Sequence, residues 1–222
     1  MRIVPLCLAL AVLAAFATAH AQPAAGNTEA AVAAAVAAYE RSDLPAARAA
    51  FTKLSAAGVA AADYNLAVMH LRGEIPASSR HEALRLMTRA AGRGFVTAMF
   101  GLGQLHENGD AGTRRLDLAK AWYERAAKAG SVDAQVATAT AHYLGRGTAK
   151  DLTQAGHWYR EAAKGGDVGA QYLIASMYES GDGVERDLRL ARYWYGIAAR
   201  NGDLAAPGKL REVDAKIAAP SN

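Results

Sequence analysis

The sequence predicts an all-α fold, a right-handed α/α solenoid built from helix–turn–helix repeats of 36 residues. The first observation is that the three tryptophans, Trp122, Trp158 and Trp194, lie 36 residues apart. The second is that an aromatic partner, an Ala-Ala pair and a glycine follow each tryptophan at fixed distances. The third is the apolar spacing within a repeat, where Ala170 and Ile174 lie one helical turn apart. A fixed period of this length is typical of a repeat array, in which each unit buries its apolar face against its neighbours.

Residues 1–21 have the features of a secretory signal peptide. Arg2 precedes an apolar run that extends to about Ala17, and Ala19-His20-Ala21 fits a small-x-small cleavage site. The run is shorter than the ~20 residues that span a bilayer, which argues against a membrane anchor. We therefore expect cleavage after Ala21 and a periplasmic or secreted protein that does not span a membrane. The alternatives are a buried first helix or a lipoprotein attached at Cys7.

The composition limits the chemistry of the exported chain. Cys7 is the only cysteine, so cleavage would leave neither a disulfide nor a reactive thiol. Without Arg2 the chain has 24 basic and 21 acidic residues, a net charge of +3. This charge lacks the clustered basic excess of a nucleic-acid-binding protein, so we expect no nucleic-acid partner.

The N-terminal segment over residues 22–61 is expected to form capping helices from a degenerate repeat. Its first helix is predicted over residues 28–41, with Asn27 or Thr28 as the N-cap. The second helix carries Phe51, which lies 36 residues before Met87.

Four full repeats are predicted within residues 62–206, and each consists of helix A, a glycine-bearing turn and helix B. They cover residues 62–97, 98–133, 134–169 and 170–205. In the last repeat, Gly181 is expected to end helix A and Asp187 to cap helix B. Gly202 is expected to end helix B. The tryptophans are interpreted as core residues of the stack and not as a ligand cage.

The C-terminal segment over residues 207–222 is expected to form a capping helix and a tail. Pro207-Gly208 precedes an amphipathic stretch in which Leu210, Val213 and Ile217 are predicted to face inward.

The repeat pattern resembles the Sel-1-like repeat family. The last repeat carries the pattern at Ala170, Ile174, Ala175, Tyr178, Gly181, Gly183, Val184, Asp187, Ala191, Trp194, Tyr195, Ala198, Ala199 and Gly202. The repeat over 98–133 departs from it, because Ala111 replaces the second glycine and Arg115 replaces the capping aspartate. The resemblance implies a tetratricopeptide-like solenoid and an exported adaptor that binds other proteins, with no enzymatic activity and no cofactor. An envelope protein or a membrane sensor would be such a partner.

The resemblance also implies that helix A lines a concave face used for binding. Its third, seventh and tenth positions in each repeat are the candidate partner-binding residues: Tyr64, Val68, Leu71, Phe100, Gln104, Glu107, Val136, Thr140, Tyr143, Tyr172, Ser176 and Glu179. This mixture of aromatic, polar and acidic groups suits an extended peptide or a partner helix. For the first of these positions, the alternative is that the side chains serve packing between helices.

No catalytic or metal-binding residues are predicted. His70, His106 and His142 share the 36-residue spacing, but repeats stack about 10 Å apart whereas zinc ligands lie about 2 Å from the ion. We interpret these histidines as packing residues in the slot that Tyr178 fills. An alternative function is binding of cell-wall glycan, or binding and hydrolysis of β-lactams, which the resemblance links to a cysteine-rich branch of the family.

Overall fold

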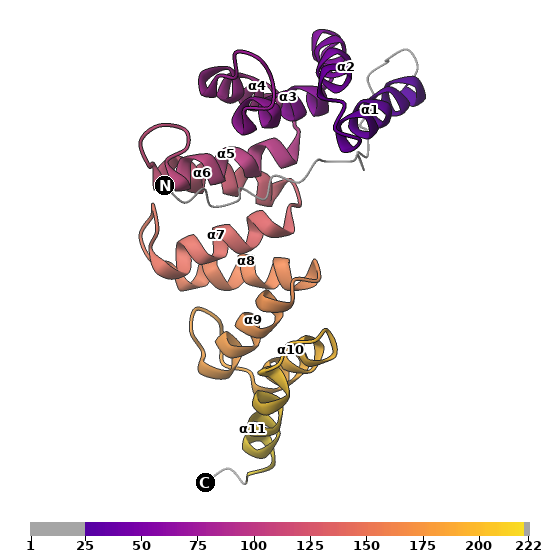
Figure 1. Cartoon of the computed structure of the whole chain (residues 1–222). Coiled ribbons are helices and arrows are strands. Elements are labelled where there is room, and N and C mark those ends of the chain that lie inside the picture. Colours follow the sequence, from indigo (N-terminus) through magenta and orange to yellow (C-terminus); the bar gives the residue numbers. More distant parts are fainter. Residues whose placement is uncertain (1–24, 220–222) are drawn as a thin grey trace. The chain divides into compact units, whose positions relative to one another are not determined.

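The computed structural model describes residues 25–219, and the predicted signal peptide lies outside them. Within these residues the chain forms eleven α-helices and no strand (Figure 1). None of the eleven is long and apolar enough to cross a membrane. The helices group into an N-terminal part that ends at Leu105 and a C-terminal part that begins at His106. The two parts are described separately below.

The helices follow the predicted alternation of helix A and helix B. The N-terminal part contains α1 (Ala25–Glu40), α2 (Leu44–Ala56), α3 (Ala60–Arg72) and α4 (Arg80–Gly92), and α5 (Val96–Asn108) contains the division between the parts. The C-terminal part contains α6 (Leu116–Lys128), α7 (Val132–Leu144), α8 (Leu152–Lys164), α9 (Val168–Ser180), α10 (Leu188–Arg200) and α11 (Ala206–Ala218). Helix A of the four repeats is α3, α5, α7 and α9, and helix B is α4, α6, α8 and α10. The predicted helical repeat architecture is confirmed.

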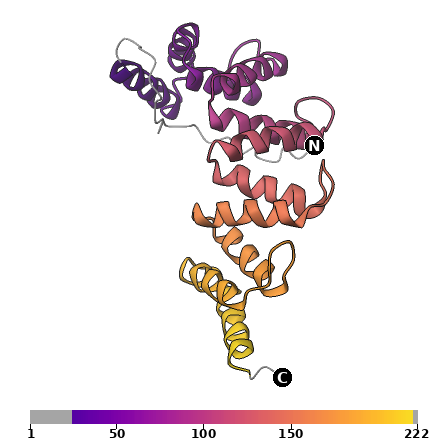
Figure 2. The ribbon, with the colours of Figure 1, turned by 180° about the vertical axis from the view of Figure 1, so that it is seen from behind.

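Within each part, helices that are neighbours in the sequence pack against each other. In the C-terminal part α6 contacts α7, and each following helix contacts the next as far as α11, an order that the view from behind also displays (Figure 2). The paired alanines of helix B, such as Ala162 and Ala163, are buried in this core. Their small side chains allow adjacent helices to approach closely, as packed helices do at about 8–10 Å.

The ends of the helices follow the sequence signals. Gly145 and Gly181 are in the left-handed conformation, with φ of 71° and 87°, and end α7 and α9. The carboxylate of Asp187 accepts hydrogen bonds from the backbone N–H groups of Arg189 and Leu190, so the predicted cap of α10 is confirmed. Arg115 makes no side-chain cap to α6, as its replacement of aspartate implied.

The second glycine of the turn serves a close approach between helices. A Cβ on Gly183, which has φ of 71°, would lie 2.2 Å from the carbonyl oxygen of Leu152 at the start of α8. A Cβ on Gly147 would lie 2.3 Å from the carbonyl oxygen of Leu116 at the start of α6. The turn of one repeat therefore rests on the backbone of the preceding helix B, and a side chain at these positions would separate them.

The tyrosine of each Trp-Tyr pair, and not the tryptophan, is the more deeply buried residue. Tyr159 and Tyr195 lie in the core of the C-terminal part, where Trp158 is only half-buried. Trp122 is also half-buried, and the guanidinium of Arg125 lies 4.4 Å from its ring centroid. Trp194 is buried. The prediction of core packing therefore holds fully for Trp194, whereas Trp122 and Trp158 cover the edge of the core.

An ion-pair network that the sequence did not reveal joins three helices of the N-terminal part. Asp63 of α3 is fully buried, and its carboxylate accepts hydrogen bonds from Ser55 of α2 at 2.6 Å, from Arg89 of α4 and from Arg93 directly after α4. A buried carboxylate needs such partners, because burying an unpaired charge is very costly. The network therefore fixes the positions of these helices relative to one another.

Two details at the ends of the chain correct the sequence predictions. Helix α1 already begins at Ala25, so Asn27 and Thr28 lie in its first turn and are not its N-cap. At the other end, Val213 is buried and Leu210 is half-buried, but Ile217, which was predicted to face inward, is exposed over 41 % of its surface. Pro207 lies in the first turn of α11, where a missing N–H costs no hydrogen bond.

Candidate functional site

The candidate residues divide between the two parts of the chain. Those of the C-terminal part, which we call the helix-A face, are Glu107, Val136, Thr140, Tyr143, Tyr172, Ser176 and Glu179. On α7 and α9 they recur at intervals of four and three residues, which places them along one side of each helix. Tyr143 is exposed over 37 % of its surface, and the other six are half-buried.

Two candidates of the N-terminal part are inaccessible, which corrects the prediction for them. Tyr64 and Val68 are fully buried within α3. The ring of Tyr64 packs against Phe95 with 5.4 Å between centroids, and burial raises the pKa of Tyr64 to about 12. Tyr64 serves packing, the alternative that the sequence left open for the third position of the repeat. Val68, at the seventh position, is buried as well. Leu71, Phe100 and Gln104 are half-buried.

A tyrosine of α10 contacts two members of the helix-A face on α9. The ring of Tyr195 meets Tyr172 edge to face at 5.2 Å, and its hydroxyl donates to Glu179 Oε2 at 2.9 Å. Lys216 of α11 donates to the other oxygen of Glu179 at 2.5 Å. Burial raises the pKa of Glu179, but the hydrogen bonds from Lys216 and Tyr195 outweigh it and leave the pKa lowered.

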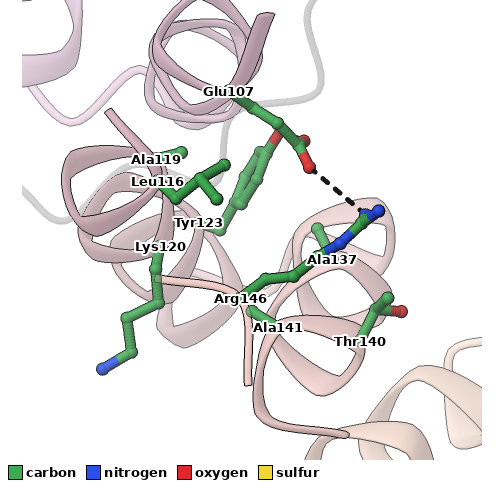
Figure 3. Close-up of a pocket in the computed structure, with 9 residues that line it drawn as sticks. All are labelled: Glu107, Leu116, Ala119, Lys120, Tyr123, Ala137, Thr140, Ala141 and Arg146. Atoms are coloured by element: carbon green, nitrogen blue, oxygen red, sulfur yellow. Dashed lines mark hydrogen bonds and ion pairs between the residues drawn. The ribbon is translucent and has the colours of Figure 1, made fainter. Parts of the chain in front are cut away.

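The same arrangement surrounds Glu107 at the end of α5. The hydroxyl of Tyr123 in α6 donates to Glu107 Oε2 at 2.7 Å, and Arg146 after α7 approaches Glu107 Oε1 at 3.8 Å (Figure 3). The pKa of Tyr123 is raised, first by burial and then by its bond to this carboxylate. Each acidic member of the helix-A face is thus held by the tyrosine of its own repeat and by a cation from a later element.

The repeat between these two has an aromatic residue in the acidic position. Tyr143 meets the ring of Tyr159 at 6.4 Å, and Thr140 shares a hydrogen bond of 3.0 Å with the hydroxyl of Tyr159. Lys150 lies 5.7 Å from the centroid of the Tyr143 ring. The helix-A face therefore carries an aromatic centre between two carboxylate–cation pairs.

The pairing changes the charge that the helix-A face presents to solvent. The side chain of Arg146 is 51 % exposed against 32 % for Glu107, and that of Lys216 is 48 % exposed against 12 % for Glu179. The sequence predicted acidic groups at these positions, whereas the structure exposes the cations more than the carboxylates. The sequence did not reveal Arg146 and Lys216, because they lie far along the chain from their partners, Arg146 in the turn after α7 and Lys216 in α11.

A small cavity of about 170 Å³ opens beside Glu107. Methyl groups of Leu116, Ala119, Ala137 and Ala141 line it, and Glu107, Lys120, Tyr123, Thr140 and Arg146 complete its wall (Figure 3). Its volume is sufficient for one side chain and well below the 300–1,000 Å³ typical of small-molecule sites.

A second, more open cavity of about 610 Å³ lies between α8 and the turn that precedes α10. Its lining is rich in polar groups, among them Thr153, Gln154, His157 and Arg160 of α8 and Glu185 of the turn. One residue in the sequence, Gly156, is related to this arrangement, because it has no side chain where the turn approaches α8. A Cβ there would lie 2.8 Å from Val184 Cγ1.

The repeated histidines lie at the predicted packing positions. His142 is buried with its Nε2 3.4 Å from Glu124, and Nδ1 of His70 accepts a hydrogen bond of 3.2 Å from the N–H of Ser79. Burial lowers the pKa of His70 and of His106. Among residues 25–219 there is no group of three or more His, Cys, Asp or Glu side chains that could hold a metal ion.

The fold and the helix-A face define an α/α repeat protein that presents side chains from successive helices. A family model for the Sel1 repeat matches residues 60–95, 96–131, 132–167 and 168–203, and the chain belongs to this family. Each matched segment starts two residues before the corresponding repeat predicted from the sequence. Its first residue is also the first residue of helix A. Sel1 repeat proteins are generally scaffolds for protein interactions and typically not enzymes.

Solved structures of Sel1 repeat proteins are similar to this chain. A Sel1 repeat protein from Oxalobacter formigenes is 31 % identical with a TM-score of 0.69, and the match covers 76 % of this chain and 49 % of that one. The protective antigen c5321 of uropathogenic Escherichia coli, which displays an SLR fold, is 25 % identical with a TM-score of 0.77, covering 89 % and 43 %. The chain thus spans half or less of the length of these two proteins. No curated protein matches the sequence.

Proposed function

We propose that this chain is an exported adaptor that binds a protein partner on its helix-A face. The observation that carries the proposal is the exposed aromatic residue Tyr143 between two carboxylate–cation pairs. Aromatic side chains are the usual anchors of protein interfaces, and flanking polar groups orient the partner. Membership of a family of interaction scaffolds and the signal-like N-terminus support the same reading.

Site-specific photo-crosslinking in cells tests this proposal. A photoreactive amino acid replaces Tyr143 or Tyr172, and the control places it at Arg125, an exposed residue of α6. We expect one dominant protein adduct from both positions on the helix-A face, identified by mass spectrometry and absent from the control. Equal adducts from Arg125, or no adduct from either tyrosine position, would refute binding at this face.

Export is tested separately by cell fractionation. Substituting Ala19 and Ala21 with bulky residues removes the small side chains that signal cleavage requires. We expect the unaltered chain outside the cytoplasm at a mass reduced by residues 1–21, and the variant uncleaved. An unaltered chain that stays in the cytoplasm at full mass would contradict export.

The second cavity favours a different candidate function, the binding of cell-wall glycan. The side chains of His157, Arg160 and Gln154 make no hydrogen bond or ion pair among residues 25–219, although the His157 ring meets Trp158 edge to face, and together they suit a hydroxyl-rich ligand. Sedimentation with purified sacculi tests it, with Arg160→Ala as the variant and Lys128→Ala as the exposed control. Retention in the supernatant would exclude wall binding, and unchanged nitrocefin in the same samples would exclude β-lactam hydrolysis.

A further inference from the structure

Each repeat of the C-terminal part carries a cation at the same position of the turn between helix A and helix B. Arg114, Lys150 and Arg186 lie 36 residues apart and are all exposed. Nε of Arg114 donates to the carbonyl oxygen of Glu107 at 2.8 Å, and Nε of Arg186 donates to that of Glu179 at 3.1 Å. A cation at the end of a helix complements its dipole, so these residues have a structural role. The terminal guanidinium nitrogens of Arg114 take no part in this bond and are available to a partner.

Arg146 adds a further cation beside the small cavity, and its ion pair is loose. The 3.8 Å between Arg146 Nη1 and Glu107 Oε1 exceeds the 2.7–2.9 Å of a charge-assisted hydrogen bond. Glu107 also accepts a hydrogen bond of 2.7 Å from Tyr123 through its other carboxylate oxygen, Oε2. Arg146 can therefore turn to an incoming carboxylate without leaving Glu107 unpaired.

The local charge balance around the cavity favours an acidic partner. Arg114, Arg146 and Lys150 are exposed. The carboxylates next to them in the sequence are engaged, because Glu107 is bonded to Tyr123, Asp117 pairs with Arg115 at 2.7 Å, and the side chain of Asp151 caps α8. Asp110 is half-buried. Lys120 is also present, but it pairs with Glu124 at 2.8 Å and points away from Arg146 (Figure 3). Complementary charge steers a partner to such a surface and sets its orientation.

The cavity itself selects the neighbouring residue of that partner. Its inner wall consists of methyl groups from α6 and α7, and its volume of about 170 Å³ holds a single side chain. An aliphatic side chain would bury apolar area there, which is favourable at about 25 cal/mol per Å². Arg146 also lines this cavity, and its guanidinium points towards Glu107 (Figure 3).

We infer that the helix-A face takes a peptide segment in which an aliphatic residue lies next to aspartate or glutamate. The aliphatic side chain occupies the cavity between α6 and α7, and the carboxylate pairs with Arg146. Arg114, which bonds to the carbonyl oxygen of Glu107, and Lys150, which lies near the Tyr143 ring, add positive charge. This inference rests on the proposed function and names the chemistry of its partner.

Nuclear magnetic resonance of the isotope-labelled protein tests the inference without knowledge of the natural partner. The probes are two blocked peptides, Gly-Glu-Leu-Glu-Gly and Gly-Lys-Leu-Lys-Gly, at millimolar concentration. We expect the acidic peptide to shift the amide signals of Ala137 and Thr140 and the side-chain Nε signal of Arg146, and the basic peptide to leave them in place. Equal shifts from both peptides, or none, would overturn the inference.

Variants of one residue complete the test. Arg146→Gln should weaken binding of the acidic peptide about tenfold or more, as loss of one partner of a charged pair does, and Arg146→Lys should retain most of it. Lys128→Gln removes one exposed charge of α6 that has no partner among residues 25–219, and should change nothing. Unchanged affinity in Arg146→Gln would overturn the assignment. Crosslinking at Tyr143 that succeeds while the acidic peptide fails would leave the adaptor function standing and reject only its acidic partner.

Discussion

The hydroxyl of Tyr195 in α10 donates a hydrogen bond of 2.9 Å to the carboxylate of Glu179 in α9. The phenol ring is fully buried, whereas the carboxylate lies at the edge of the helix-A face. The bond therefore connects the core of the repeat to its candidate binding surface. The pKa of Tyr195 is raised, first by burial and then by this carboxylate, so the phenol remains a hydrogen-bond donor.

Removing this hydroxyl should destabilise the C-terminal part. We expect Tyr195→Phe to lower the free energy of unfolding by about 1–2 kcal/mol, because a hydrogen bond to a charged group is lost. Urea unfolding measures the change. The control is Tyr193→Phe. The Tyr193 ring is exposed and its hydroxyl makes no hydrogen bond among residues 25–219, so this variant should change stability by less than about 0.5 kcal/mol. Equal effects of the two variants would show that the bond contributes little.

The two glycines Gly183 and Gly202 should differ in their tolerance of alanine. Both have positive φ, 71° and 96°, so Gly→Ala costs about 1–2 kcal/mol at either site. At Gly202 a Cβ would meet nothing within 4 Å, whereas at Gly183 it would lie 2.2 Å from the Leu152 backbone. We expect Gly183→Ala to be the more destabilising by at least about 1 kcal/mol in urea unfolding, since overpacking adds to the strain. If Gly202→Ala proved the more harmful variant, the close approach of turn and helix would be wrong.

The missing N-cap of α6 can be supplied. Arg115→Ser should raise the free energy of unfolding by about 0.5–1 kcal/mol, because serine can accept from the free N–H groups of the first turn. The ion pair that Arg115 makes with Asp117 is exposed, so its loss should cost less than this gain. Thermal or urea unfolding is the measurement. As the reverse case, Asp187→Ala should remove an existing cap and cost about 1 kcal/mol. A loss of stability in Arg115→Ser would contradict this account of the helix start.

His70 should make stability depend on pH near neutrality. Burial lowers its pKa in the folded state below the ordinary value of 6.5, so the unfolded chain takes up a proton first as the pH falls. Stability from this group is therefore fully present above pH 6.5 and is lost as the pH falls through that value towards the folded pKa. His70→Asn keeps an acceptor for the N–H of Ser79 but cannot titrate, so it should reduce the change in urea midpoint between pH 7.5 and 5.5.

The matched control for this effect is His81→Asn. His81 lies exposed in the first turn of α4, so its substitution should leave the pH dependence as it is. If His70→Asn kept the full pH dependence of the unaltered chain, another group would be responsible.

The helical repeat was predictable from sequence because its signals are local. The glycine that ends helix A and the aspartate that caps helix B act through contacts within a few residues of the chain. Gly181 and Asp187 lie where those rules place them. The same rules anticipated the uncapped start of α6 at Arg115. They failed at Asn27 and Thr28, which lie inside the first turn of α1 and do not precede it.

The candidate site was predictable only in part, since its chemistry depends on pairs distant in sequence. The resemblance to a known repeat family pointed to Glu107 and Glu179, but their partners Arg146 and Lys216 lie more than 30 residues later and were decided by the stacking of helices. The same stacking buried Tyr64 and Val68. The sequence by itself determined the repeat, its helices and their ends, because these are properties of short stretches of chain. The tertiary structure alone decided which charges meet and which reach solvent, because Coulomb energy and burial depend on distance in space.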